Sequence, residues 1–463
     1  MGMGIDGMAS GLNTTEIINA LIAAEARPQA LMKFKVTKDT ALVTAMQALN
    51  TKFAALTTQA TALSKPGGLD KYQVLSSSDA ITATISAGAK ATSLDLAVNK
   101  LALAHTIVSA PMTAWPATPA TMTFVKDDGT TTEVTATSNS LDELAYAINQ
   151  SDAGVSAVKI ASGVDTAGVP QFRLQMTAKD TGAANSFTAH QGTAADVAAG
   201  TAADLAKAPG AAVLRAGQDA EVTLWAGTPA QQTITSATNT FASLAPGVDI
   251  TVKKLSADPV TMAVTRDAAA MTATAKELST AVNIILGSIF TQSAVTPGAG
   301  ADGNSTVTAG IFMGQSTITA AKAKLFNAVA DPIDGKSAAT IGINTTKNGD
   351  LSFDADAFAA AYAKDPAAVE KTLATIAGRV AEASKSISDP YSGTLSQRVK
   401  GQQSVIDDLN SQIVDWDSRL ANRRTTLQAV YTNLEVQMSK MQSQQSWLTA
   451  QISSFDAAAS SKK

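Results

Sequence analysis

Three glycines at the start of the chain have the spacing of a dinucleotide-binding loop. Gly2, Gly4 and Gly7 spell G-x-G-x-x-G, a pattern that holds a pyrophosphate when it follows a strand and opens a helix. Only Met1 precedes Gly2 in the sequence, so the required strand is not there. We interpret these glycines as part of a flexible leader.

A second motif has the ending of a phosphate-binding P-loop. Gly335, Lys336 and Ser337 match its Gly-Lys-Ser sequence. However, Ala330 stands where the loop needs its first glycine, and a helical pattern rather than a strand comes before it. We expect a simple turn at these residues and no nucleotide cofactor.

Metal and acid–base chemistry have few candidate residues. His105 and His190 are the only histidines, and neither has a carboxylate at the spacing of a metal site or a catalytic triad. Asp127, Asp128 and Glu133 are acidic neighbours, which we interpret as the solvated turn of a hairpin. We therefore predict no bound metal, no cofactor and no enzymatic activity.

The composition favours several slender domains over one large enzyme core. The chain has 463 residues, of which 16% are charged and only 5% aromatic, so it is long enough for several domains with thin cores. It has no cysteine, which excludes disulfides and thiol catalysis. A repeated helical pattern at both ends must then supply much of the structure.

Charge and hydropathy limit the partners. The net charge of −4 with no basic cluster gives no reason to expect nucleic acid as a partner. The longest strongly apolar stretch, Ala281 to Phe290, is too short to insert across a membrane. The first cationic residue is Arg27, so we expect no standard secretory signal. If the protein is exported, we expect it to use another route.

The C-terminal end carries an apolar seam at alternating steps of four and three residues, the period of a supercoiled helix. The seam comprises Leu395, Val399, Gln402, Ile406, Leu409, Ile413, Trp416, Leu420, Arg423, Leu427, Val430 and Leu434, and then Met438, Met441, Gln445, Leu448, Ile452 and Phe455. The extra four-residue step from Leu434 to Met438 is a stutter, which unwinds a supercoil locally. Gln402, Arg423 and Gln445 are polar seam residues of the kind that fix register. A continuous rod of roughly 90 Å is expected at 1.5 Å per residue, and it needs a partner.

The N-terminal end repeats this spacing more weakly. Its seam comprises Leu21, Ala24, Pro28, Leu31, Lys35, Lys38, Leu42, Met46, Leu49, Phe53, Leu56, Ala60 and Leu63. Pro28 suits the first turn of a helix. We therefore expect a mobile segment to about Arg27 and a helix from Pro28 to about Ser64, which the following Pro66 and Gly67 would end.

The period changes from 3.5 to 2 between the helical ends. Alternating strands are predicted at 80–86, 93–98, 121–125, 131–136, 221–225, 248–253 and 260–265, with a Ser140-x-x-Glu143 capping box opening a short helix to about Gln150. Helical segments return at 267–290, 316–329, 355–363 and 366–388, and Asn348-Gly349 is a turn signal. We expect a flexible break at 298–304 and a loose loop or short helix at 192–217.

The predicted fold class is α+β and multidomain, in which long terminal coiled-coil helices and a helical leg domain bracket two nested, mostly antiparallel β-rich domains. The expected parts are 1–70, a mobile segment and coiled-coil helix; 71–120, the first half of the inner β-rich domain; 121–244, the distal variable β-rich domain; 245–267, the return strands of the inner domain; 268–390, the leg domain; and 391–463, the C-terminal coiled-coil helix.

Five motifs in this order resemble the flagellar filament cap family, also called hook-associated protein 2 or FliD. They are Gly7-Met8-Ala9-Ser10-Gly11-Leu12-Asn13 with Ala24-Glu25-Ala26-Arg27-Pro28; Asp95-Leu96-Ala97-Val98; Pro246-Gly247-Val248-Asp249-Ile250; Asn348-Gly349-Asp350-Leu351-Ser352-Phe353-Asp354; and Leu434-Glu435 with Met438-Ser439. Residues 110–220 match the family in layout rather than in motif.

The resemblance implies a secreted, extracellular cap at the distal tip of a bacterial flagellum, needed for filament elongation and motility. It implies a ring-like homo-oligomer of four to six copies that holds exported flagellin and promotes its folding and insertion. Further partners it implies are the hook-associated junction proteins and a flagellar export chaperone, and host mucin or glycans for the distal domain.

We expect the two seams to contact flagellin helices or other copies of the chain. The candidate contact residues are Leu42, Met46, Leu49, Phe53, Leu56, Leu63, Ile406, Leu409, Ile413, Trp416, Leu420, Leu427, Leu434, Met438, Met441, Leu448 and Ile452. The alternative is an internal helical hairpin in which the seams bury only each other. Alternative functions are another flagellar axial protein, such as a junction protein or flagellin, and a surface adhesin.

Overall fold

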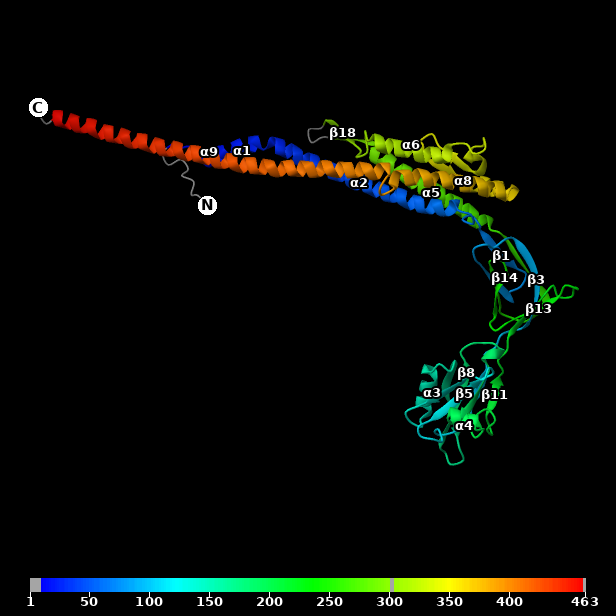
Figure 1. The fold of residues 1–463 in the computed structure, drawn as a ribbon. Helices are drawn as coiled ribbons and strands as arrows, with labels where there is room; N and C mark the ends of the chain where they lie inside the picture. Colours follow the sequence, from blue (N-terminus) through cyan, green and yellow to red (C-terminus); the bar gives the residue numbers. More distant parts are fainter. Residues whose placement is uncertain (1–9, 300–303, 461–463) are drawn as a thin grey trace. The chain divides into compact units, whose positions relative to one another are not determined.

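The computed structural model describes residues 10–299 and 304–460. The chain divides into two compact units, one formed by residues 1–68 with 272–463 and the other by residues 69–271. Figure 1 shows their elements in the order of the sequence. Mixed helices and antiparallel sheets between long terminal helices confirm the predicted fold class.

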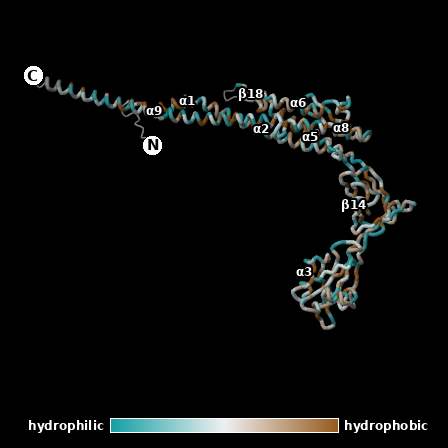
Figure 2. Tube along the Cα trace, in the orientation of Figure 1, coloured by the Kyte–Doolittle hydropathy of each residue, from teal (hydrophilic) through white to brown (hydrophobic). Residues whose placement is uncertain are grey.

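The helical unit consists of the two ends of the chain and the segments that lead to the C-terminal helix. Its helices are α1 (Thr14–Glu25), α2 (Arg27–Ser64), α5 (Ala268–Ser293), which begins at the boundary between the units, α6 (Ser316–Ala330), α7 (Ala355–Lys364), α8 (Pro366–Ser388) and α9 (Thr394–Ser460). The α2 helix packs on α8 and α9, and α1 packs on α9 (Figure 1). In Figure 2 apolar residues recur along a largely hydrophilic α9.

Helix α2 confirms the predicted helix from Pro28 to about Ser64, with proline in its first turn. The predicted mobile segment before Arg27 is wrong for residues 14–25, which form α1. Asn13 caps this helix, because its side-chain oxygen accepts the Glu16 N–H at 3.0 Å and its amide donates to the Glu16 carboxylate at 3.0 Å. Ile18 is buried on the packed face, so a cap and a tertiary contact together stabilise a helix that the weak seam did not indicate.

Two short antiparallel ribbons complete the helical unit. They are β17 (Val295–Ala299) with β18 (Ser305–Ala309), and β19 (Ile343–Thr345) with β20 (Leu351–Phe353). The second contains the predicted Asn348-Gly349 turn, in which Gly349 has a φ of +77°. The first occupies part of the predicted break at 298–304, and residues 300–303 of that break lie outside the described part of the chain.

The β-rich unit begins with an inner module of two sheets. One has the order β1-β16-β3-β12-β13 and the other β14-β15-β2. Their strands are β1 (Tyr72–Ser76), β2 (Ile81–Ile85), β3 (Thr92–Lys100), β12 (Ala220–Leu224), β13 (Gln232–Ser236), β14 (Thr240–Ala245), β15 (Val248–Val252) and β16 (Ser256–Arg266). Leu96, Val222, Ile250 and Met262 lie in the core between the sheets.

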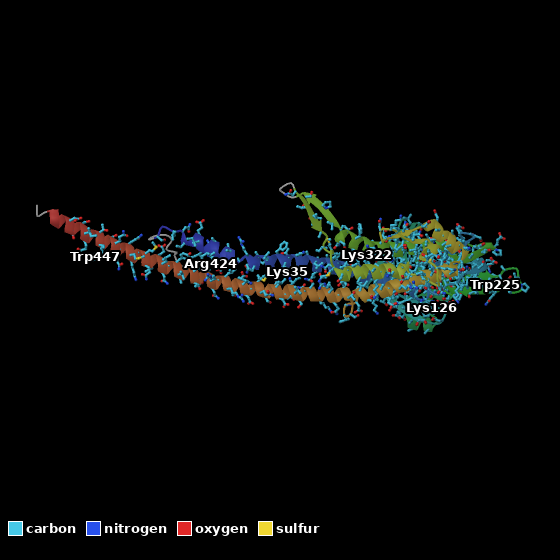
Figure 3. All side chains as sticks on the ribbon, turned by 90° about the horizontal axis from the view of Figure 1, so that it is seen from above. Lys35, Lys126, Trp225, Lys322, Arg424 and Trp447 are labelled. Carbon is cyan, nitrogen blue, oxygen red and sulfur yellow. The ribbon has the colours of Figure 1, made fainter. Side chains whose placement is uncertain are left out.

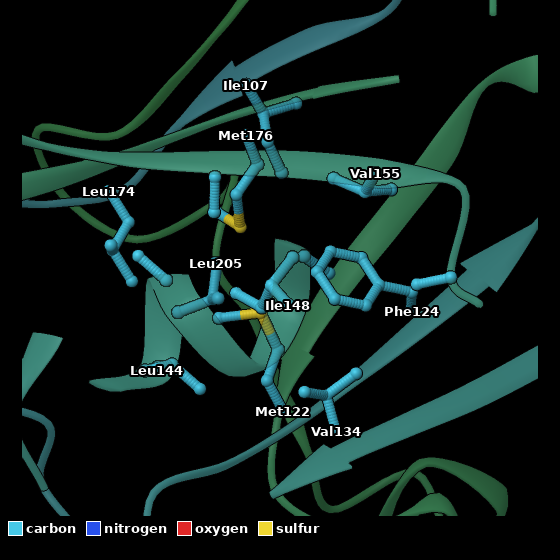
Figure 4. Packing of buried hydrophobic residues seen from close by; sticks show 14 of the residues in the cluster. Ile107, Met122, Phe124, Val134, Leu144, Ile148, Val155, Leu174, Met176 and Leu205 are labelled. Atoms are coloured by element: carbon cyan, nitrogen blue, oxygen red, sulfur yellow. The ribbon is translucent and has the colours of Figure 1, made fainter. Parts of the chain in front are cut away.

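The distal module has two further sheets, β10-β9-β5-β6 and β11-β4-β8-β7. Its elements are β4 (Thr106–Val108), β5 (Thr121–Lys126), β6 (Thr131–Thr135), α3 (Leu141–Gln150), β7 (Val155–Val164), β8 (Pro170–Ala178), β9 (Phe187–Gln191), α4 (Ala194–Ala198), β10 (Ala203–Asp204) and β11 (Ala212–Arg215). Figure 4 shows Phe124, Ile148 and Met176 converging in its core.

Strand pairing crosses two of the expected domain boundaries. Strands β12, β13 and β14 were expected in the distal domain 121–244, but they pair in the inner sheets, where Val222 lies opposite Val98. Strand β4 was expected in the inner segment 71–120, but it pairs with β8 and β11 of the distal module. Alternation of apolar residues predicts a strand and its buried face, but it does not say which sheet the strand joins.

The predicted capping box at Ser140 forms only in part. The Ser140 hydroxyl accepts the Asp142 N–H at 3.3 Å, while the Glu143 carboxylate accepts a hydrogen bond from Thr137. A reciprocal capping box instead joins Thr193 and Asp196 at the start of α4. This capping box lies within residues 192–217, where only a loose loop or short helix was predicted.

Candidate interaction surface on the terminal helices

Helices α2 and α9 run antiparallel and are joined by polar contacts at two levels. The Gln29 amide donates to Asp417 Oδ1 at 2.6 Å and to the Ile413 carbonyl at 3.2 Å. About six turns along α2, the Asn50 amide donates to Ser396 Oγ at 3.2 Å. These contacts fix which residues of the two helices lie at the same height, and both views of the molecule show the helices side by side (Figures 1 and 3).

Helix α1 extends the pairing along α9. Arg423 Nε lies 3.0 Å from the Glu25 carboxylate, and an Arg424 N–H donates to the Asn19 side-chain oxygen at 2.8 Å. Arg423 was predicted to fix register, and the ion pair is consistent with that role. Both partners are about half exposed, so the pair contributes at most about 1 kcal/mol. Its value lies in alignment rather than in stability.

The second half of the N-terminal seam is buried inside this chain. The predicted contact residues on α2 that lose nearly all solvent exposure are Leu42, Met46, Leu49, Phe53, Leu56 and Leu63. They lie on a helix that packs against α8 and α9 of the same unit. These six residues therefore form internal core in the structure, as the helical-hairpin alternative expected, and can meet another protein only if the bundle opens.

The α9 seam changes from buried to exposed along its length. Ile406, Leu409 and Leu427 are buried, and the polar seam residue Gln402 is buried with them. The half-buried group is Ile413, Trp416, Leu420 and Met438, and the exposed group is Leu434, Met441, Leu448 and Ile452. Polar Gln445 is exposed as well, while the side chain of Phe455 lies outside the described residues.

The exposed end of the seam begins where the paired helices end. Ser10, shortly before α1, donates its backbone N–H to the Glu435 carboxylate at 3.2 Å. Beyond this level no element in the described part of the chain covers Met441, Leu448 and Ile452, each of which is more than half exposed. Apolar side chains at these helical spacings form a stripe that a partner helix can cover.

Trp447 is a further exposed apolar side chain at this end of α9 and was not on the predicted seam. It is 62% exposed and neighbours Leu448 (Figure 3). The strict 4–3 spacing passed over it. A large aromatic residue in a Gln- and Ser-rich segment is the signal that indicates it, since tryptophan is enriched at protein interfaces.

The residues singled out for nucleotide or metal chemistry have structural roles. Ser337 caps a short 3-10 helix, and the turn before it pairs Ile333 with Lys336 through Gly335 at a φ of +76°. This confirms the predicted turn. Asp128 accepts the Thr130 N–H within the predicted hairpin. The Gly2, Gly4 and Gly7 pattern lies outside the described residues.

The two histidines of the distal module have different surroundings. His105 is buried, its ring edge meets Phe187 at a centroid distance of 4.9 Å, and its Nδ1 accepts the Gly217 N–H at 3.3 Å. Burial lowers the pKa of His105 below its ordinary value, while the charge of Asp127 partly opposes that shift. His190 Nε2 lies 2.9 Å from Thr188 Oγ1. The described residues hold no cluster of three or more His, Asp or Glu side chains suited to a metal ion.

Comparison with known proteins gives two matches to family models. The N-terminal model of flagellar hook-associated protein 2 matches residues 10–105, and the C-terminal model matches residues 217–443. The chain belongs to the flagellar hook-associated protein 2 family. Residues 106–216 lie outside both models, and they correspond to the distal module from β4 to β11.

Relatives in this family align with nearly the whole chain. Flagellar hook-associated protein 2 of Escherichia coli K12 is 25% identical over 476 aligned positions, which cover 96% of this chain and 97% of the relative. The protein from Escherichia coli O157:H7 gives the same values. The D1-D2-D3 domains of the Escherichia coli flagellar cap protein FliD superpose with a TM-score of 0.52 at 21% identity, covering 78% of this chain and 96% of that one. That likeness supports the fold.

The family is a structural component of flagella and oligomerises. Among the helices that the structure describes, none has both the length and the apolar character needed to cross a bilayer. The paired terminal helices leave an apolar surface open on α9, beyond the level of Glu435.

Proposed function

We propose that this protein caps the distal end of a bacterial flagellar filament, as an extracellular homo-oligomer that holds exported flagellin while it folds and inserts. The observation that carries the proposal is the match of both hook-associated protein 2 models, in the expected order, to the segments that form the terminal helices and the inner module. The role is structural rather than enzymatic.

The flagellin contact lies on the open part of α9. Met441, Leu448 and Ile452 form an apolar row that no described element of the chain covers, and Trp447 is exposed beside this row. Flagellin's amphipathic terminal helices are partners of the right chemistry, because an apolar helix stripe is covered by another apolar stripe. The buried half of the N-terminal seam, from Leu42 to Leu63 on α2, instead holds α9 in the helical unit and so anchors this exposed row.

The contacts are weak and exchangeable, which suits a cap that must move as subunits are added. A ring of four to six copies need not match the symmetry of the filament, so its legs cannot all fit the filament equally well at one time. Since flagellin folding buries apolar surface, it can supply the free energy that moves the cap. Junction proteins, an export chaperone and host glycans stay as further expected partners.

Deletion of the gene tests the function. The expected result is loss of filaments, with unpolymerised flagellin released into the medium and both effects reversed by the gene on a plasmid. Normal filaments in the deletion strain would contradict a capping role. Loss of filaments without flagellin in the medium would indicate a role in export or in the hook instead.

A further inference from the structure

The outer face of α2, near its N-terminus, carries a row of cations around two exposed apolar side chains. Residues 26–41 contain one arginine, three lysines and a single aspartate. Leu31 and Phe34 are 71% and 70% exposed, and they lie among Arg27, Lys35 and Lys38 at helical spacings of three and four. We name these five residues the basic stripe.

The basic stripe lies on the side of α2 opposite its packed face. Gln29 is buried against α9, and Met32 and Val36 on the same side are half-buried. Asp39, at the flank, is half-buried and its Oδ2 has no hydrogen-bond partner. No described residue forms an ion pair with Lys35 or Lys38, and both side chains are exposed. Figure 3 labels Lys35 on this helix.

The outer face of α9 is acidic at the same height. Residues 403–418 contain four aspartates and no lysine or arginine. Asp407, Asp408 and Asp415 are exposed, and Val414 between them is 63% exposed. We name these four residues the acidic stripe. It lies away from the buried seam positions Ile406 and Leu409.

The polar contacts between the helices align the two stripes. Since Gln29 lies beside Ile413 and Asp417, and Asn50 beside Ser396, the antiparallel register places Leu31 near the level of Val414. The same register places Lys38 near the level of Asp407. We call the paired helices α2 and α9 the leg. Over the length shared by the two stripes, the α2 side of the leg is therefore basic and apolar, and the α9 side is acidic and apolar.

We infer that the basic stripe of one copy docks on the acidic stripe of the next copy, so that neighbouring legs form a heterologous contact around the ring. A rotation axis along the legs keeps equivalent residues at equal height, so stripes at one level meet between neighbours. Opposite charges at the rim orient the contact, and the central apolar side chains lose exposure to water. The inference rests on the homo-oligomer of the proposed function.

Cross-linking between differently labelled copies tests this contact. The chain contains no cysteine, so Lys35→Cys in one population and Asp408→Cys in another are the only thiols in a mixture of full-length proteins. A 35–408 disulfide can then form only between copies. We expect it at low salt, roughly tenfold above a mixture of Asp408→Cys with Lys276→Cys, and we expect it to decline as salt rises.

A charge exchange separates pairing from folding. Lys38→Glu added to the first population should abolish most of the cross-link, and Asp407→Lys added to the second should restore it. Lys276→Glu with Lys324→Glu is a matched control on exposed lysines outside the stripes, and it should have no effect. Circular dichroism of each variant checks that the helices persist.

Three results would overturn the inference. They are a 35–408 yield no higher than that of the control pair, 35–35 and 408–408 disulfides formed as readily as the 35–408 disulfide, and no loss of the 35–408 disulfide when Lys38→Glu is added. Because the assay uses purified protein without flagellin, its failure leaves the deletion test of the capping function unaffected.

Discussion

Gln29 and Asp417 are 388 residues apart in sequence, yet their side chains meet at 2.6 Å between α2 and α9. Gln29 is buried, and its amide also donates to the Ile413 carbonyl. This contact joins the N-terminal helix α2 to the C-terminal helix α9 and fixes the register between them.

Gln29→Ala should lower the free energy of unfolding of the helical unit by about 1–2 kcal/mol, because a partly buried hydrogen bond to a carboxylate is lost. In a double-mutant cycle with Asp417→Asn the two effects should not add. Urea unfolding followed by circular dichroism measures them. Gln403→Ala is the control, since its partner Asp407 lies on the exposed face of α9. Equal effects at 29 and 403 would contradict the register contact.

Phe53→Ala should destabilise the helical unit by about 3–5 kcal/mol, because Phe53 is fully buried and its removal leaves a cavity. Phe290→Ala removes the same side chain at a site that is 62% exposed, and it should change stability by less than about 0.5 kcal/mol. Thermal or urea unfolding compares the two. A mild Phe53→Ala variant would mean that this part of the seam is not core, and would return Leu42 to Leu63 to the list of contact residues.

Gly247→Ala should lower the stability of the inner module by more than the cost of its positive φ alone. Gly247 has a φ of +69°, and a Cβ there would lie 2.5 Å from the Ala89 backbone nitrogen. Gly129 has a φ of +82° with no atom within 4 Å of the added carbon. We expect a cost of about 1 kcal/mol for Gly129→Ala and about 3 kcal/mol or more for Gly247→Ala. Similar losses in unfolding experiments would argue against the close approach.

The β-rich unit should lose stability in mild acid because of His105. Its pKa is lowered by burial in the folded state, so the unfolded chain binds a proton more readily than the folded chain. The contribution is complete above the ordinary pKa of 6.5 and is lost as the pH falls from there through the folded-state pKa. His105→Gln should remove this part of the pH dependence, measured as unfolding free energy between pH 8 and 5.

If His105→Gln and the parent protein show the same slope, protonation of His105 does not contribute to acid instability.

Much of the fold was predictable from spacing and turn residues. Pro28 and the seam gave α2, and Asn348-Gly349 gave the turn between β19 and β20. The sheet of β12 was not predictable, because alternation sets the buried face of a strand and long-range pairing sets its neighbours. Helix α1 was missed because its stability comes from the Asn13 cap and from packing on α9.

Which seam residues are exposed could be predicted only in part, because exposure also depends on long-range packing. The seam spacing treats Met46 and Met441 alike, yet the first is buried and the second exposed. Burial depends on which helices pack alongside, and the spacing within one helix does not contain that information. Truncation at residue 395, an obvious test from sequence, would remove the buried Leu395 and Ile406 and so would test folding rather than binding.

The open end of α9 is a better target for testing the capping mechanism. The substitutions Met441→Asp, Leu448→Asp and Ile452→Asp place charges on the exposed apolar row without touching buried residues. Ser443→Asp with Gln451→Asp is the control at exposed polar positions of the same segment.

The most direct measurement is filament length and secreted flagellin in a deletion strain that carries each variant. We expect short or absent filaments with monomeric flagellin in the medium for the triple variant, and filaments of normal length for the control. Normal filaments with the triple variant, exported at the level of the parent protein, would contradict the claim that this row of α9 holds the filament tip.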